Sequence, residues 1–147
     1  METEAATVVR LNGADDFNAA FDVGSDEQLV VVKYYASWCR ACKALGPKVE
    51  KIARNHPNVR FYELEFEANK ALCKELGIKV LPWIEIFKGG RSTKLESFSC
   101  GPSKAAQINE KVRYYLDGGT APLASAQPAD DRDGDGGAGV QAEPGSG

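Results

Sequence analysis

The chain has 147 residues, with 18 Lys and Arg against 21 Asp and Glu and a formal net charge of −3. This length allows one domain with a substantial core and is too short for two ordinary domains. No stretch approaches the roughly 20 apolar residues that a membrane-spanning helix needs, and the charge balance gives no basic face for nucleic acid.

The N-terminal residues Met1–Ala6 show neither the basic and apolar segments of a secretory signal nor the basic, Ser-rich character of a transit peptide. The first strand is predicted over residues 7–11. A helix follows, with its apolar residues between Phe17 and Phe21 and with Asp15 or Asp16 as its cap.

Residues 29–35 form a near-continuous apolar run, which is typical of a strand covered on both faces of a sheet. A helix is predicted over 41–55, because apolar residues recur there at helical spacing. The next strand covers 59–66, and a helix over 69–76 ends at Gly77.

Two strands, at about 83–88 and 93–98, flank Gly89-Gly90 and should form a hairpin. A last helix begins after Gly101-Pro102-Ser103 and runs to Leu116. The order β-α-β-α-β-α-β-β-α places parallel units first and an antiparallel hairpin last. It predicts an α/β fold with a central mixed sheet and helices on both faces.

The composition changes sharply near Asp117. Residues 118–147 hold eight of the fifteen glycines, no aromatic residue, and five acidic residues against one basic residue. Such a segment cannot bury enough apolar surface to offset the entropy of ordering. We therefore predict a folded domain over 1–117 and a disordered acidic tail over 118–147. Three of its acids resemble the start of a calcium loop, but Ala142 stands at the twelfth position, where an acid is needed, so a solvated linker is favoured.

Cys39 and Cys42 are separated by two residues, at the point where the strand over 29–35 gives way to a helix. A helix start supplies N–H groups and the positive end of the dipole, which stabilise a thiolate. This pattern is typical of thiol–disulfide exchange. Cys39, nearer the helix start, is the expected nucleophile, and Cys42 is the thiol that resolves the mixed disulfide.

Half of a zinc site and an inert structural pair are the alternatives for these two cysteines. Zinc is disfavoured because Cys73 and Cys100 are single, with no second Cys-x-x-Cys. Pro82, between a hydrophobic loop and the strand that begins at Trp83, is the second part of the redox signature.

These features resemble the thioredoxin family over about residues 7–117. The resemblance rests on Ala36–Lys43, Pro47, Leu81-Pro82 and Gly89-Gly90. Within that family the chain is most similar to the atypical Cys/His-rich thioredoxins of plant and algal plastids, through residues 43–48, 69–73 and 96–100. It has a single histidine, His56, and so departs from the name of that group.

The resemblance implies a thioredoxin fold and a monomeric protein-disulfide reductase that uses no organic cofactor and no metal. It implies protein disulfides as substrates, peroxiredoxins among them, and a thioredoxin-reducing enzyme or a small thiol as electron donor. It also implies the chloroplast, with the cytoplasm as the alternative. A disulfide isomerase or oxidant, and a redox-sensing docking subunit, are the competing functions.

Two departures from the family pattern bear on the chemistry. Arg40-Ala41 stands between the cysteines, where the family usually has Gly-Pro. Lys33 and Glu63 stand where the family has a buried acid and a lysine, so the charges are reversed. We expect Lys33 to pair with Glu63, and Glu63 either to move the proton of Cys42 or to serve only as a structural partner.

The remaining site residues have expected roles from the resemblance. Pro82 should follow a cis peptide bond and pack against the sulfurs. Trp38 is either a docking surface beside the sulfurs or a partly exposed aromatic with core contacts. Cys73 is expected to be a buried small hydrophobe. Cys100 is expected to be a regulatory thiol in a loop near the substrate groove, with burial as the alternative.

Overall fold

The computed structural model describes residues 7–22 and 25–120. The predicted order of strands and helices is confirmed, and short 3-10 turns at Glu67–Asn69 and Pro102–Lys104 precede the last two helices. In chain order the elements are β1 (Val8–Leu11), α1 (Gly13–Ala19), β2 (Leu29–Tyr35), α2 (Arg40–Asn55), β3 (Arg60–Glu65), α3 (Lys70–Leu76), β4 (Trp83–Lys88), β5 (Lys94–Ser99) and α4 (Ala106–Leu116).

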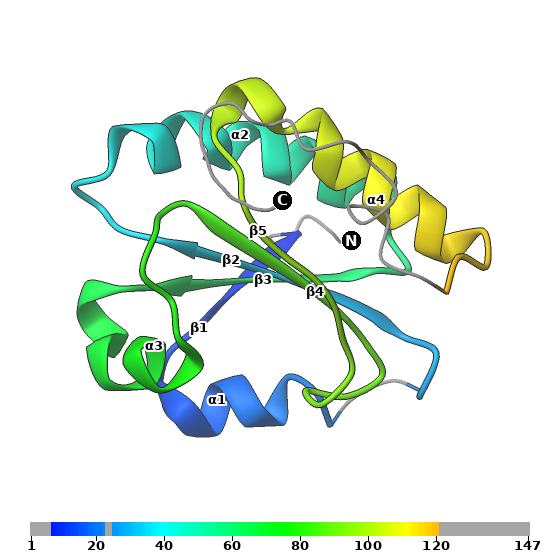
Figure 1. Cartoon of the computed structure of the whole chain (residues 1–147), viewed down its shortest axis with the longest axis horizontal. Helices are drawn as coiled ribbons and strands as arrows, with labels where there is room; N and C mark the ends of the chain where they lie inside the picture. Colours follow the sequence, from blue (N-terminus) through cyan, green and yellow to red (C-terminus); the bar gives the residue numbers. More distant parts are fainter. Residues whose placement is uncertain (1–6, 23–24, 121–147) are drawn as a thin grey trace, which may run out of the picture.

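The five strands form one mixed sheet in the order β1-β3-β2-β4-β5. β1 and β2 both run parallel to β3, whereas β4 is antiparallel to β2 and to β5. Helices α2 and α4 cover one face of the sheet, and α1 and α3 cover the other (Figure 1). The expected architecture, a mixed sheet with helices on both faces, is therefore confirmed.

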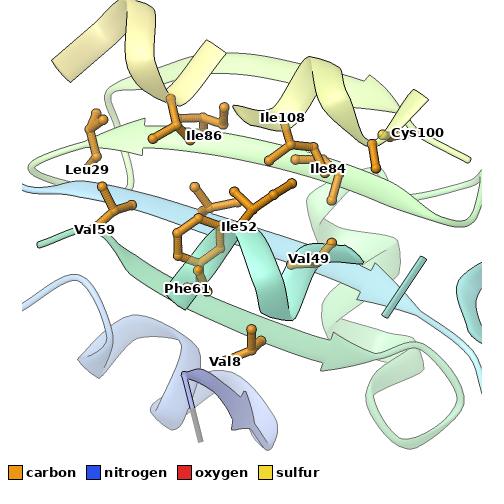
Figure 2. Packing of buried hydrophobic residues seen from close by; sticks show 14 of the residues in the cluster. Val8, Leu29, Val49, Ile52, Val59, Phe61, Ile84, Ile86, Cys100 and Ile108 are labelled. Atoms are coloured by element: carbon orange, nitrogen blue, oxygen red, sulfur yellow. The ribbon is translucent and has the colours of Figure 1, made fainter. Parts of the chain in front are cut away.

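The central strand β2 contributes to both cores. Val31 faces the core under α2 and α4, while Val30 and Val32 face the core under α1 and α3. Successive strand residues point to opposite faces, so a strand with a helical layer on each side needs apolar residues throughout. Figure 2 shows the first of these cores, where Ile52 from α2 and Ile108 from α4 lie over the sheet.

The start of α1 differs from the prediction. Its N-cap is Asn12, and neither Asp15 nor Asp16 takes that place. The Asp16 carboxylate instead accepts the backbone N–H of Asn12 at 3.0 Å, from within the helix. The backbone N–H of Gly13 instead donates to Oδ1 of Asn69, the residue directly before α3, at 2.7 Å. A long-range amide thus does what a local carboxylate was expected to do.

The chain beyond α4 stays attached to the domain for a few residues. Gly118 N–H donates to the Tyr115 carbonyl at 3.2 Å, and Gly119 N–H donates to the Tyr114 carbonyl at 3.0 Å. The rest of the predicted tail, residues 121–147, lies outside the described residues, so its disorder and the boundary at 117 stay predictions. Among the described helices, none has the length and apolar character to cross a bilayer.

We predict that removing residues 121–147 leaves the free energy of unfolding within about 0.5 kcal/mol of the full chain, because every core residue that the structure describes is kept. Removing residues 118–147 should cost ~1 kcal/mol more, because the two backbone hydrogen bonds at Gly118 and Gly119 are also lost. Urea unfolding of the two truncated chains measures both values. A large loss of unfolding free energy on removal of residues 121–147 would mean that the tail docks on the domain.

Candidate functional site

Cys39 and Cys42 lie at the first turn of α2, directly after β2. Cys39 is the N-cap residue, with an extended backbone at φ −89° and ψ 111°, and its Sγ accepts the Cys42 N–H at 3.2 Å. The two residues are joined as a disulfide, with their Cα atoms 5.2 Å apart. A spacing of three residues at a helix start places both side chains on one side of the first turn, so the pair can close and open there.

The two cysteine residues are both buried, Cys39 slightly less so than Cys42. Cys39 is 8% exposed and Cys42 is 3% exposed, and both pack with Ala36. Partly buried side chains close around this cluster from four segments of the chain: Tyr35, Ala41, Phe66 and Leu81. Cys39 is thus slightly the more exposed residue of the two, although both are buried in the disulfide form.

The backbone around Cys39 favours a thiolate in the reduced protein. Its sulfur is the acceptor for an N–H at the positive end of α2, and both the hydrogen bond and the helix dipole stabilise negative charge. A thiolate is the reactive form in disulfide exchange. The arrangement can thus supply a nucleophile (Cys39) and, three residues on, a second thiol that closes the ring.

Pro82 follows Leu81 in the loop before β4. The Leu81–Pro82 peptide bond is cis, as the resemblance led us to expect. Pro82 is buried, and its carbonyl accepts the N–H of Cys100 at 3.2 Å, while Leu81 packs against the cluster of the two cysteines. The loop before β4 is thereby held against the redox centre.

Trp38 projects from the loop before α2. This residue is 64% exposed, and its indole N–H donates to Glu67 Oε2 at 3.0 Å. The hydrogen bonds from Trp38 and then from Lys70 lower the pKa of Glu67. This exposure fits a docking surface better than a core contact. Arg40, the first residue of α2, is also exposed.

The expected ion pair between Lys33 and Glu63 is confirmed. The two residues lie opposite each other on β2 and β3, with Lys33 Nζ 3.2 Å from Glu63 Oε1. The side chain of Lys33 is 7% exposed and that of Glu63 is 14% exposed. Glu63 forms a second ion pair with Arg10, which lies opposite it on β1. The Arg10 guanidinium donates to Glu63 Oε2 at 3.1 Å. The sequence did not reveal Arg10 as a second partner of Glu63, because this contact depends on the register of β1 on β3.

These charges lie under the first turns of α2. A Cβ added to Gly46 would be 3.8 Å from Lys33 Nζ, and Gly46 is about one helical turn beyond Cys42. Tyr35 joins the two regions: its ring lies 5.2 Å from Lys33 Nζ and also packs against the cysteine cluster. Burial, and then the charge of Glu63, raise the pKa of Tyr35.

The other two cysteines belong to the two hydrophobic cores and not to the cluster of Cys39 and Cys42. Cys73 is buried as expected, in the core under α1 and α3. Cys100 is buried in the opposite core, where Figure 2 shows it near α4. Burial raises the pKa of each thiol to about 11. Residues 7–22 and 25–120 hold no group of three or more His, Cys, Asp or Glu placed to hold a metal ion.

The burial of Cys100 bears on the two roles expected for it. It is 1% exposed, and its Sγ points to the backbone, 3.4 Å from the Lys104 carbonyl. A thiol that is buried and almost fully protonated at neutral pH reacts slowly with oxidants. The structure therefore argues against a regulatory thiol at Cys100 and favours the buried alternative.

Comparison with known proteins agrees with this geometry. The family model for thioredoxin matches residues 8–114. "Thioredoxin-like 2-2, chloroplastic" of Arabidopsis thaliana is 39% identical over 103 residues, covering 70% of this chain and 43% of that protein. "Thioredoxin-like 2, chloroplastic" of Oryza sativa subsp. japonica is 32% identical over 109 residues, covering 74% of this chain and 49% of that protein. The chain thus spans less than half the length of these relatives.

A solved structure confirms the fold class. Thioredoxin f from spinach chloroplast (short form) matches with a TM-score of 0.65 and 30% identity, over 79% of this chain and 99% of that one. The expected thioredoxin fold is therefore confirmed.

We predict that Glu63→Gln destabilises the protein more than Lys33→Met does. Glu63 is the one acidic partner of Lys33 among the described residues, whereas Glu63 keeps Arg10 when Lys33 is lost. Leaving a buried ammonium unpaired should cost roughly 3 kcal/mol, against ~1 kcal/mol for Lys33→Met. The double variant should recover part of the loss of Glu63→Gln. Urea unfolding of the three variants measures this order, and equal losses for the two single variants would contradict it.

Proposed function

This chain belongs to the thioredoxin family, and on that basis we propose that it reduces disulfides in partner proteins. The observation that carries the proposal is the placement of Cys39 Sγ at the N-terminus of α2, paired with Cys42 and packed against Leu81, which precedes the cis Pro82. A nucleophile, a resolving thiol and a rigid neighbouring loop are what this exchange requires.

The reaction proceeds in two exchanges. The Cys39 thiolate attacks one sulfur of the partner's disulfide, and the other partner sulfur leaves as a thiolate and takes up a proton. The Cys42 thiol then loses its proton and attacks Cys39 Sγ, which breaks the mixed disulfide and releases the second partner sulfur. The partner has gained two electrons, and Cys39 and Cys42 end as the disulfide seen here. An external dithiol or a reducing enzyme must return the two electrons.

Glu63 is the proposed acceptor for the proton of Cys42. Two observations support this: Lys33, its ion-pair partner, lies under α2 about a turn from Cys42, and Tyr35 contacts both the charged pair and the cysteines. A purely structural ion pair is the alternative. The Lys33→Met/Glu63→Gln double variant separates the two, because proton transfer requires it to resolve the mixed disulfide slowly although its stability is partly recovered. Resolution as fast as in the wild type from pH 6 to 9 leaves only the structural role.

The chloroplast is the proposed location, since the relatives reported above carry that compartment in their names. Peroxiredoxins are a proposed partner class on the strength of the family resemblance. The isomerase or oxidant and the docking subunit remain the competing functions. Reduction of insulin separates an enzyme from a docking subunit, and the reduction potential separates a reductant from an oxidant.

We predict that Cys39→Ser abolishes disulfide reduction, whereas Cys42→Ser still attacks and accumulates as a mixed disulfide with its partner. The physical reason is the higher exposure of Cys39 and its place at the helix start. Mass spectrometry of the reduced protein, alkylated briefly at low pH, should show Cys39 labelled first. Faster labelling of Cys42 would reverse the assigned roles. Cys73→Ser serves as the control, since that thiol is buried and belongs to another cluster, the core under α1 and α3.

Arg40 should set the reduction potential. A fixed cation between the thiols favours the Cys39 thiolate and so stabilises the reduced form, and each 1.4 kcal/mol of preference raises the potential by about 30 mV. We predict a potential less negative than the roughly −270 mV typical of thioredoxin. Replacing Arg40-Ala41 with Gly-Pro, or Arg40 with Gln, should lower it, measured by equilibration with glutathione. Arg40→Lys keeps the charge and should change it little. An unchanged value for Arg40→Gln removes Arg40 from this role.

A further inference from the structure

A pocket of about 430 Å³ lies at the C-terminal end of α3, close to the redox centre. Ile78, which is 4% exposed, and the partly buried Phe66 give it an apolar floor. Three exposed lysines surround that floor. The lining residues are Phe66, Lys70, Lys74, Gly77, Ile78 and Lys79.

The end of α3 builds this pocket. Gly77 adopts a left-handed conformation, with φ at 79°, and its N–H donates to the Lys74 carbonyl at 3.1 Å. Ile78 N–H donates to the Cys73 carbonyl at 2.9 Å, which completes a helix-ending turn and brings Ile78 under the helix. Lys70 and Lys74 are one turn apart and share a face of α3. Lysine stems lie along apolar surface while their ammonium groups stay in water.

Two of these cations are free to meet a ligand. Lys70 Nζ lies 3.3 Å from Glu67 Oε1 and is already paired. Lys74 and Lys79 make no ion pair with any residue in 7–22 or 25–120. An apolar floor under an excess of positive charge fits an apolar side chain with carboxylates beside it, and it disfavours a basic segment.

The pocket shares a wall with the redox centre. Phe66 lines the pocket and also packs against the cluster of Cys39 and Cys42. On the other side, Lys79 leads through Val80, which is 51% exposed, to Leu81, which packs on the same cluster. Figure 1 shows α3 and the start of α2 at the same edge of the sheet. A peptide whose disulfide meets Cys39 can therefore extend into the pocket.

We propose that this lysine-rimmed pocket binds an apolar side chain flanked by Asp or Glu, located near the reducible disulfide of the partner protein. The pocket thereby selects among partner disulfides that Cys39 could attack equally well. This inference rests on the disulfide reductase activity proposed above. The chain's own acidic segment over 121–147 is a different candidate occupant, although α4, from which it continues, covers the face of the sheet opposite α3.

The test compares three disulfide-ring peptides that are identical except for the residues after the second cysteine: Glu-Phe-Glu, Gln-Phe-Gln and Glu-Ser-Glu. The full chain reduces them with dithiothreitol as electron donor, and kcat/KM is measured for each. The first peptide should be preferred by roughly threefold to tenfold over Gln-Phe-Gln, the range expected for two exposed charge contacts. It should also be preferred over Glu-Ser-Glu, which lacks the apolar side chain for the floor of the pocket. The preference over Gln-Phe-Gln should shrink as salt is raised.

Lys74→Gln/Lys79→Gln should bring the ratio between the Glu-Phe-Glu and Gln-Phe-Gln peptides close to one. Lys74→Glu/Lys79→Glu should shift the preference to a Lys-Phe-Lys peptide. The matched control is Lys48→Gln/Lys51→Gln, which removes the same charge from exposed positions on α2 and should keep the wild-type ratio.

The peptide kinetics separate the role of the pocket from the reductase activity. If Lys74→Gln/Lys79→Gln reduces the peptides with the wild-type ratio, the pocket does not select partners, and the reductase activity stands. If the wild type reduces none of the peptides, the proposed function itself fails. If deleting residues 121–147 raises kcat/KM for Glu-Phe-Glu in the wild type and not in Lys74→Gln/Lys79→Gln, the tail occupies the pocket and the partner segment is overturned as its occupant. An unchanged kcat/KM after the deletion supports the partner segment.

Discussion

The burial of β2 on both faces is the constraint on which the rest of the structure depends. Val30, Val31 and Val32 are each 0% exposed, so this strand cannot shift without exposing one core or the other. The strand ends at Tyr35, and α2 begins at Arg40. The redox pair therefore lies at a point held by two hydrophobic layers, and the direction of the first helical N–H groups is set by the packing of α2 against the sheet.

The same strand carries the most unusual charge of the molecule. Lys33 occupies a position where both neighbours along the strand are buried, and its ammonium is accommodated by Glu63 on the next strand. Arg10 adds a second cation to Glu63 from the edge strand, where its side chain is 67% exposed. The two charges are therefore stabilised unequally. The Lys33 ammonium depends on the Glu63 carboxylate, whereas the Glu63 carboxylate has two cationic partners and partial contact with water. This asymmetry makes Glu63 the centre of the network.

The proposed reactive pair and the proposed binding pocket lie in different parts of the fold. Cys39 and Cys42 lie at the start of α2, after the central strand. The lysine-rimmed pocket belongs to α3 and the turn after it, on the other face of the sheet. Phe66 is the residue common to both, since it touches the cysteine cluster and lines the pocket. The exposed Lys74 and Lys79 can therefore be replaced without changing the cluster around the sulfurs.

Local patterns in the chain were sufficient for the elements, for their order and for the reactive pair. The apolar run at 29–35 and the Cys-x-x-Cys that follows it predicted the strand, the helix start and Cys39 as its first thiol, because the hydrogen bonds and periodicities involved join residues close in sequence. The partner of Lys33 was also foreseen, with help from the family resemblance.

Features that depend on distant segments were decided only by the tertiary structure. Arg10 joins Glu63 through the register of β1 on β3, Asn69 satisfies the first turn of α1 across the fold, and Cys100 is covered by α4 rather than exposed in a loop. The pocket beside Phe66 likewise needs the end of α3 to meet the loop before β4. Each of these contacts joins residues that share no local pattern, so no spacing along the chain could reveal them; they arise when packed layers place those residues within reach of one another.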